Sequence, residues 1–386
     1  MTQPSERLVT LFNVGSLTFG SGAGRRCAED FAARGAKRIF IVTTPPTRGL
    51  CNPLLEVFGE RNCEAMVWDG LKGEPTFDEF AEALSAARAF SADAVIGLGG
   101  GSSMDVAKLV AALFDGAQSI DEAIGVDLLK GRALPLACIP TTAGTGSEVT
   151  PIAILGDEKE DLKKGVVSRH LTPDAAYLDP LMTVTMPPAV TAATGFDALT
   201  HCIEAYANKF AHPIADIYAL AGVSLIANNL ERACNKGDDL AAREAMLLAS
   251  LYGGMCLGPV NTAAVHALAY PLGGEFHIAH GVANALLLPH VLKFNLETEP
   301  ARYAAIAKAL GVSDTGDDFT TAQRGVDKIV ELAKRCDVEQ HMSTFGIGAD
   351  AIPRMAKAAM TVTRLLERNP RPLTEHDAIG IYEAAL

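Results

Sequence analysis

The sequence predicts an α/β domain built on a parallel sheet, followed by a second domain made only of helices. Its 386 residues exceed what one hydrophobic core usually serves. Short apolar runs alternate with helical patterns in the first half, which is typical of a parallel sheet covered by helices. From about residue 187 the strand-like runs stop, and alanine-rich helical periodicity takes over. We therefore expect domains at residues 1–186 and 187–386.

Individual segments of the first half follow from local patterns. Apolar or β-branched runs bounded by glycine and proline predict strands at residues 38–44, 65–70, 92–101 and 134–142. Amphipathic periodicity predicts helices at 77–90 and 103–114. Residues 150–168 hold two apolar runs around the charged stretch 157–164, which predicts a β-hairpin with a solvated tip.

Composition excludes several classes of protein. A formal net charge of −13 offers no broad basic face, so we expect no nucleic-acid partner. The start, MTQPSERLVT, lacks the apolar core of a secretory signal, and no uninterrupted apolar stretch reaches the roughly 18 residues of a membrane span. The eight cysteines form no C-x-x-C pair, which favours reduced, buried thiols. We expect a cytoplasmic protein.

A glycine-rich turn follows the strand predicted at 92–101. Gly99, Gly100 and Gly101 allow the backbone to approach a phosphate, and Ser102 supplies a hydroxyl at the start of a helix. The full dinucleotide fingerprint is absent, because Ser102 stands where a third glycine would be. The alternative is a tight strand-to-helix turn that needs glycine for its geometry alone.

A second small, polar loop, PTTAGTGSEVT at 140–150, follows the strand at 134–142. By itself it can be a hydroxyl-rich connection with capping residues. Two such loops at the carboxyl ends of neighbouring parallel strands are where an open α/β sheet binds a nucleotide. The pair therefore favours nucleotide binding more strongly than either loop does.

The second half contains an acid and a histidine at helical spacing. Asp197 and His201 are four residues apart, so they lie on one face of a helix. The stretch 265–290 holds four of the nine histidines, and His266, His277 and His280 are candidates for further ligands. Three imidazoles and one carboxylate suit a divalent Fe, Zn, Co or Mn ion that keeps Lewis acidity.

The same residues also allow an interpretation without a metal. Asp197 follows Gly195 and can be the N-cap of its helix, and His201 can be a buried ring with a hydrogen-bond partner. The residues alone leave both interpretations open.

Taken together, four blocks resemble the iron-containing (group III) alcohol dehydrogenase family. They are GLGGGSSMDVAK (97–108), IPTTAGTGSEVT (139–150), TGFDALTHCIEAY (194–206) and HALAYPLGGEFHIAHGVANALLLP (266–289), and they stand in the family's order along the whole chain. The resemblance implies a dehydroquinate-synthase-like architecture, with a dinucleotide-binding α/β domain, a helical domain and an active site in the cleft between them. It also implies a homodimer.

The resemblance assigns roles to particular positions. It implies that Fe²⁺ or Zn²⁺ is held by Asp197, His201, His266 and His280. It places the NAD or NADP diphosphate at Gly99–Ser102 and further cofactor contacts at Thr141, Thr142 and Thr145.

Two positions depart from the family pattern. Tyr270 occupies the place where many members carry a second histidine, so we expect Tyr270 or His277 to serve the proton path. Thr44 is the last residue of the first predicted strand, a place where NAD-preferring members often have an acid that holds the adenosine ribose. Without that acid a 2′-phosphate is not repelled, so the sequence leaves both NAD and NADP open as the coenzyme.

The function implied is metal-dependent, NAD(P)-linked hydride transfer between a small alcohol, diol or hydroxy acid and its aldehyde or ketone. Two alternatives stay open at the level of sequence. One is a related fold with glycerol-dehydrogenase-like or dehydroquinate-synthase-like chemistry. The other is a nucleotide-binding protein with a structural metal and no catalysis.

Overall fold

The structure is a computed structural model that describes residues 7–157 and 162–386. These residues group into two compact units. We call the first the α/β unit; it comprises Phe12–Thr142 and Gly146–Thr185. The second, the helical unit, comprises Met186–Leu386 together with Ala143–Thr145 and the described residues up to Leu11. The predicted fold class, an α/β domain followed by an all-helical domain, is confirmed. The roles assigned to residues 1–186 and 187–386 stay predictions.

The main sheet of the α/β unit has six parallel strands in the order β1-β9-β6-β4-β2-β3. A smaller sheet has the order β5-β8-β7, and β7 and β8 form the predicted antiparallel hairpin. Residues 158–161 of the predicted tip lie outside the described residues. The strands are β1 (Ser16–Phe19), β2 (Arg38–Val42), β3 (Glu64–Trp68), β4 (Ala94–Gly99), β5 (Gly125–Val126), β6 (Leu136–Pro140), β7 (Ile152–Asp157), β8 (Leu162–Val167) and β9 (Ala175–Leu178).

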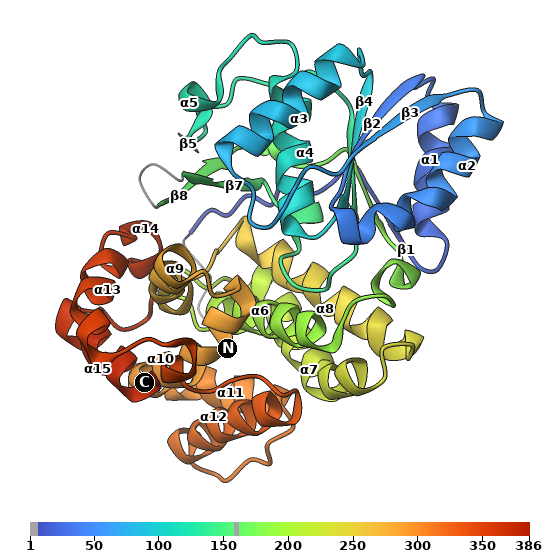
Figure 1. Cartoon of the computed structure of the whole chain (residues 1–386). Helices are drawn as coiled ribbons and strands as arrows, with labels where there is room; N and C mark the ends of the chain where they lie inside the picture. The colour runs from blue at the N-terminus through green and yellow to red at the C-terminus, as the bar shows by residue number, and fades with distance from the viewer. Residues whose placement is uncertain (1–6, 158–161) are drawn as a thin grey trace. The chain divides into compact units, whose positions relative to one another are not determined.

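Helices cover both faces of the six-stranded sheet (Figure 1). Along β2, Ile39 and Ile41 pack on the face covered by α1 and α2, whereas Phe40 and Val42 pack on the face covered by α3 and α4. Strand alternation explains why this short run is apolar throughout. The helices of this unit are α1 (Ala23–Ala33), α2 (Asn52–Glu60), α3 (Phe77–Ala89), α4 (Gly101–Leu113) and α5 (Ile120–Ala123).

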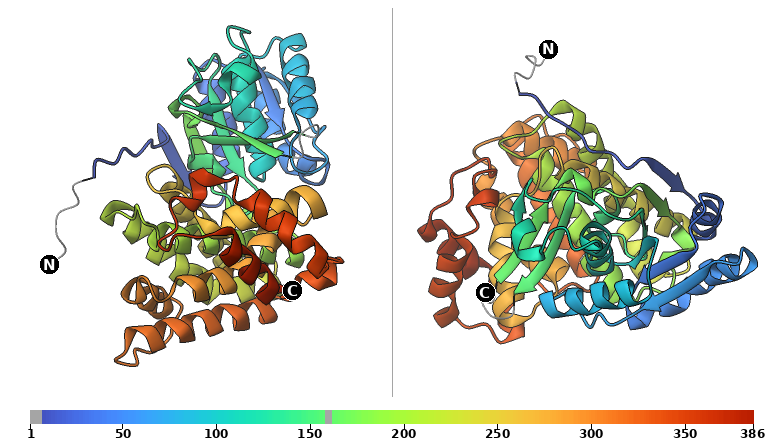
Figure 2. Two further views of the ribbon diagram at one scale, coloured as in Figure 1. Left: turned by 90° about the vertical axis from the view of Figure 1, so that its left-hand side faces the viewer. Right: turned by 90° about the horizontal axis from the view of Figure 1, so that it is seen from above.

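The described chain from residue 186 onward contains helices and no strand, as the yellow-green to red ribbons of Figure 2 show. Helix α6 lies at the centre of this unit and packs against α7, α8 and α10. The helices are α6 (Pro188–Tyr206), α7 (Pro213–Asn235), α8 (Leu240–Leu257), α9 (Ala264–Phe276), α10 (His280–Asn295), α11 (Pro300–Ala309), α12 (Asp318–Arg335), α13 (Ile352–Ala359), α14 (Thr363–Leu366) and α15 (Glu375–Ala385).

Two helices, α7 and α8, are long and apolar enough by length and composition to cross a membrane. The expectation of no spanning segment rested on uninterrupted apolar runs, and polar residues interrupt the sequences of both helices. Both contribute side chains such as Val223, Leu230 and Met246 to the core of the helical unit. Core helices of globular proteins commonly pass the same test.

The two polar loops predicted from the sequence follow adjacent strands. β4 and β6 pair in parallel, and the amide of Thr141 donates to the carbonyl of Gly99 over 2.9 Å. A buried network holds the second loop against α4. The ammonium of Lys108 donates to the hydroxyl oxygens of Ser147 (2.7 Å) and Thr150 (3.1 Å), and the Ser147 hydroxyl donates to Asp105 over 2.6 Å. These hydrogen bonds therefore fix the conformation of the second loop beside α4.

Glu148 lies in this loop and is 1% exposed. Burial raises its pKa to about 7, although its own backbone amide and Lys108 partly oppose the effect. Because the folded pKa is above the ordinary value of 4.5, folding favours the protonated acid. This contribution is fully present below pH 4.5 and is lost as the pH rises through about 7.

We expect Glu148→Gln to leave thermal stability nearly unchanged at pH 5 and to raise it at pH 8. The gain at the higher pH has an upper limit of about 3 kcal/mol, because a neutral amide no longer has to ionise in a buried place. Scanning calorimetry at both values measures the difference. Glu82→Gln, at an exposed glutamate of α3, serves as control and should change the midpoint little at either pH. An equal effect of Glu148→Gln at pH 5 and pH 8 would contradict the prediction.

Candidate metal centre

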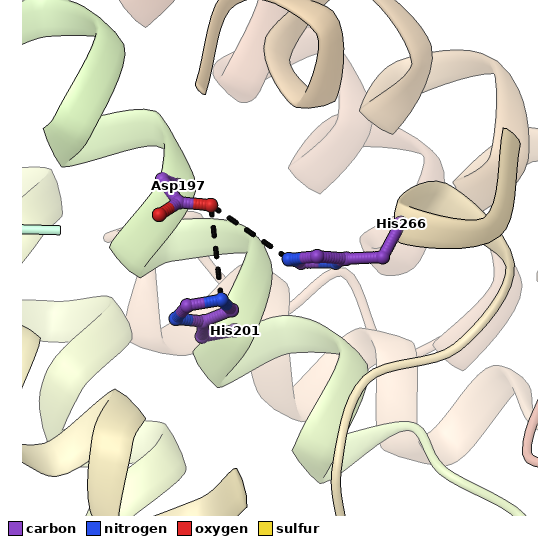
Figure 3. Close-up of side chains that lie close together, drawn as sticks. All are labelled: Asp197, His201 and His266. Atoms are coloured by element: carbon purple, nitrogen blue, oxygen red, sulfur yellow. Dashed lines mark ion pairs between the residues drawn. The ribbon is translucent and has the colours of Figure 1, made fainter. Parts of the chain in front are cut away.

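Helix α6 presents two of the predicted ligands on one face. The Oδ1 atom of Asp197 and the Nε2 atom of His201 are 3.7 Å apart, and both side chains are buried (Figure 3). Asp197 is not an N-cap, because α6 begins at Pro188, nine residues earlier. The capping alternative from the sequence is therefore wrong, and the carboxylate has no helix end to satisfy.

Helix α9 brings His266 to the same place. Its Nε2 atom lies 3.7 Å from Asp197 Oδ1, and its ring stacks on that of His201 with 4.9 Å between centroids. In Figure 3 the two imidazoles approach the same carboxylate oxygen from different helices. Ligand atoms of Asp197, His201 and His266 all lie within 4.8 Å of one another.

His280, the first residue of α10, stands beside this group. It lies outside the set of three mutually close residues, yet its Nε2 is 3.6 Å from Asp197 Oδ1. Its side chain is 29% exposed, whereas those of Asp197, His201 and His266 are about 5% exposed. His280 is thus the edge of the group that solvent reaches.

Two glycines allow the helices to come this close. A Cβ atom on Gly281 would lie 2.0 Å from the carbonyl oxygen of Ala193 in α6, so α10 can approach α6 only because residue 281 has no side chain. A Cβ on Gly253 of α8 would lie 3.2 Å from the Cβ of His201. The backbone on both sides of the group is therefore packed at the limit that glycine permits.

Burial and the neighbouring charges shift the pKa values of Asp197, His201 and His266 in opposite directions. Burial alone would raise the pKa of Asp197, but the facing imidazoles of His201, His266 and His280 hold it well below its ordinary value. Burial lowers the pKa of His201 to about 4, against the pull of Asp197. For His266 burial also acts downward, but hydrogen bonds to Asp197 and Glu204 raise its pKa to about 9. The carboxylate is thus ionised and surrounded by nitrogen atoms.

Glu204 is a member of the site that the sequence analysis missed. Its carboxylate accepts hydrogen bonds from His266 Nδ1 (2.6 Å) and from the backbone amides of Ala263 (3.0 Å) and Val265 (2.6 Å). These contacts hold the ring of His266 and keep its Nδ1 protonated, so Nε2 is the atom left for a metal. The signal was present in the sequence, since positions 197, 201 and 204 share one helical face.

The donor set fits a divalent metal ion. Two tetrahedral ligands with bonds of about 2.1 Å stand roughly 3.4 Å apart. The three nitrogen atoms are 3.6–3.7 Å from Asp197 Oδ1, so displacements of a few tenths of an ångström would suffice. Within the described chain, no lysine or arginine pairs with this carboxylate. Chemistry and spacing together support a cation at Asp197.

The two predicted proton-path residues lie on and after α9. The ring of Tyr270 is 6.5 Å from that of His280. His277 is exposed at the C-terminal end of α9 and adopts a left-handed backbone conformation, with φ of 54°. Their assignment to proton transfer stays a prediction.

Most predicted cofactor residues gather at the carboxyl end of the six-stranded sheet. A Cβ on Gly99 would meet Ser103 Oγ at 2.3 Å and Thr47 Oγ1 at 4.0 Å, and a Cβ on Gly100 would meet Thr142 at 3.5 Å. The Thr44 hydroxyl pairs with that of Thr47 over 2.7 Å.

Ser103 and Thr47, which the sequence analysis did not select, thus neighbour Gly99 in the α/β unit, together with Thr141. Thr145 groups instead with the helical unit, where Gly144 next to it packs against Thr194 of α6. Gly101 and Ser102 form the first turn of α4, whose N-cap, Gly100, makes no side-chain capping bond.

Comparison with known families covers nearly the whole chain. Residues 15–180 match the model described as iron-containing alcohol dehydrogenase. Residues 191–386 match the C-terminal model of the Fe-containing alcohol dehydrogenase family. Together these matches account for both units described above.

Individual relatives match over nearly their full lengths. The chain is 38% identical to long-chain-alcohol dehydrogenase 1 of Geobacillus thermodenitrificans, over 95% of this chain and 94% of that protein. It is 34% identical to sulfoacetaldehyde reductase of Bilophila wadsworthia, over 97% and 98%. A crystal structure of 1,3-propanediol oxidoreductase superimposes with a TM-score of 0.95 and 33% identity, covering 98% of this chain and 100% of that one. The chain belongs to the iron-containing alcohol dehydrogenase family and is a metal-binding alcohol dehydrogenase of that family.

Proposed function

We propose that this enzyme interconverts a small primary alcohol, diol or hydroxy acid and its carbonyl form by hydride transfer to or from NAD or NADP, with one Fe²⁺ or Zn²⁺ ion held by Asp197, His201, His266 and His280. The observation that carries the proposal is the buried group of Asp197, His201 and His266, whose ligand atoms lie within 4.8 Å of one another. A divalent ion held there supplies Lewis acidity toward the substrate oxygen.

The protein's own residues prepare this chemistry. Glu204 keeps the proton on Nδ1 of His266 and directs Nε2 toward Asp197. The close approach at Gly281 places His280 and α10 against α6 before any ligand arrives. For the proton that leaves the alcohol, we propose a path through Tyr270, whose ring is 6.5 Å from that of His280, or through the exposed His277 at the end of α9.

For the coenzyme we propose the turn at Gly99–Ser102 and the hydroxyls of Thr141, Thr142 and Thr145, with the adenosine end beside Thr44. The support is a helix N-terminus without a side-chain cap and two buried hydroxyl oxygens, Ser103 Oγ and Thr141 Oγ1, without a protein partner among the described residues. A phosphate is well matched to free amides and hydroxyls of this kind.

The substrate class is proposed from relatives whose names state different substrates. They include a long-chain-alcohol dehydrogenase, a sulfoacetaldehyde reductase and a 1,3-propanediol dehydrogenase of Klebsiella pneumoniae. All three names imply an alcohol–carbonyl pair, and they share no further group. We also propose a homodimer in the cytoplasm, where reducing conditions suit the eight free, buried cysteines.

The proposal is tested with the purified full chain. It is stripped of metal with a chelator, reloaded with Fe²⁺ or Zn²⁺, and assayed with short aldehydes, diols and hydroxy acids and with both coenzymes. We expect aldehyde-dependent oxidation of NADH or NADPH that is lost on stripping and returns on reloading. No turnover across this panel with both metals and both coenzymes would refute the proposed function.

We expect Asp197→Ala and His201→Ala each to remove bound metal and turnover together, because each deletes a buried donor that no neighbour replaces. Metal content by plasma emission spectroscopy and aldehyde reduction are the two measurements. His290→Ala is the control, because His290 lies on α10 outside the ligand group. The His290→Ala protein should keep its bound metal. An Asp197→Ala protein with full metal occupancy would place the site on other residues.

We expect Glu204→Gln to weaken metal binding about 10- to 100-fold, because an amide cannot accept all three hydrogen bonds and its NH₂ faces other donors. Competition with a chelator measures the affinity. The exposed Glu244 of α8 provides a matched control, Glu244→Gln, which should leave affinity unchanged. Retention of the parent affinity by Glu204→Gln would show that His266 needs no such support.

A further inference from the structure

Asn284 contacts several of the side chains proposed to bind the metal, although it is not one of the proposed ligands. It lies on α10, four residues after His280, and is completely buried. Its Nδ2 atom is 2.8 Å from Asp197 Oδ1, 3.3 Å from His266 Nε2 and 3.4 Å from His280 Nε2. One amide nitrogen therefore touches three of the four atoms proposed to bind the metal.

The oxygen of the same amide lacks the contacts that its nitrogen makes. Asn284 Oδ1 is buried and has no hydrogen-bond partner among the described residues. A buried acceptor without a partner destabilises the folded state, because it has lost its hydrogen bonds to water. The amide thus places its donor against the ligand atoms and leaves its acceptor unsatisfied.

A bound cation would favour the opposite orientation of the Asn284 amide. An ion about 2.1 Å from Asp197 Oδ1, His266 Nε2 and His280 Nε2 would lie within roughly 3 Å of the place now taken by Nδ2. An NH₂ group at that distance opposes a divalent charge with the positive end of its dipole. The imidazole lone pairs would also point to the cation and accept nothing from Asn284.

Turning the amide by 180° about its last side-chain bond exchanges oxygen and nitrogen without moving other atoms, because the two ends have nearly the same shape. We propose that Asn284 is a positioning residue of the metal centre that presents Oδ1 to the bound cation and donates from Nδ2 to Asp197 in the cation's absence. This inference rests on the proposed metal site of Asp197, His201, His266 and His280.

A purely structural role for Asn284 predicts the opposite change in metal affinity. If Asn284 served only as a donor to Asp197, it would compete with the cation, and its removal would strengthen metal binding or leave it unchanged. If Oδ1 faces the cation, removal of the amide weakens binding. The sign of the change therefore distinguishes a positioning role from a purely structural one.

The test uses Asn284→Leu and Asn284→Asp in the full chain, with Zn²⁺ as the probe and affinity measured by chelator competition. Leucine has a similar size and no polar atom, so we expect at least about tenfold weaker binding. Aspartate keeps an oxygen toward the cation and adds charge, so we expect affinity equal to or above that of the parent. Without metal, its carboxylate stands against Asp197, and Asn284→Asp should melt below the parent.

Asn369→Leu is the control for losing a buried, hydrogen-bonded asparagine. Asn369 exchanges hydrogen bonds with Asn295 and donates to the carbonyl of Arg371, so its loss should lower stability and leave Zn²⁺ affinity unchanged. Should Asn284→Leu fail to fold, Asn284→Ala takes its place, and the comparison with Asn284→Asp is unaltered.

Zn²⁺ affinity that is unchanged or higher in Asn284→Leu would overturn the proposal. So would equal weakening in Asn284→Leu and Asn284→Asp, because the oxygen would then bring no gain. If the parent protein bound no Zn²⁺, the proposed metal site itself would fail. Parent binding with either of the other two results would remove only the role of Asn284.

Discussion

The helical unit is organised around one buried carboxylate. An ionised carboxylate in a protein interior is costly unless charged or polar groups compensate it. Asp197 meets this condition through imidazoles from three helices and the amide of Asn284, and no lysine or arginine pairs with it in the described chain. The positions of α6, α9 and α10 can be understood as the packing that brings these groups to one oxygen atom.

This requirement extends to residues without any ligand role. Gly281 and Gly253 remove the side chains that would keep α10 and α8 away from α6. Glu204 accepts hydrogen bonds from His266 and from the backbone amides of Ala263 and Val265. It thereby fixes the ring of His266 relative to the backbone at the start of α9. A polar group in the core therefore sets the spacing of an otherwise alanine- and leucine-rich bundle.

Two groups of buried polar side chains, one in each unit, serve different ends. In the α/β unit, Lys108 and Asp105 bind Ser147 and neighbouring atoms of the loop after β6, and the ammonium finds three acceptors within 3.1 Å. That network is satisfied from within the protein and fixes a loop. In the helical unit, Asn284 Oδ1 has no partner in the described chain. Unsatisfied atoms beside a set of metal-type donors indicate a place for a ligand.

The sequence by itself determined the fold class, because strand alternation and helical periodicity are local properties. The family blocks also identified Asp197, His201, His266 and His280, whose meeting at one oxygen atom was visible only after folding. Tertiary structure decided what depends on contacts between distant segments. Asp197 is far from any helix end, Glu204 supports His266 across 62 positions, and Asn284 reaches Asp197 across 87. Such contacts depend on how closely two helices approach, and no local pattern encodes that distance.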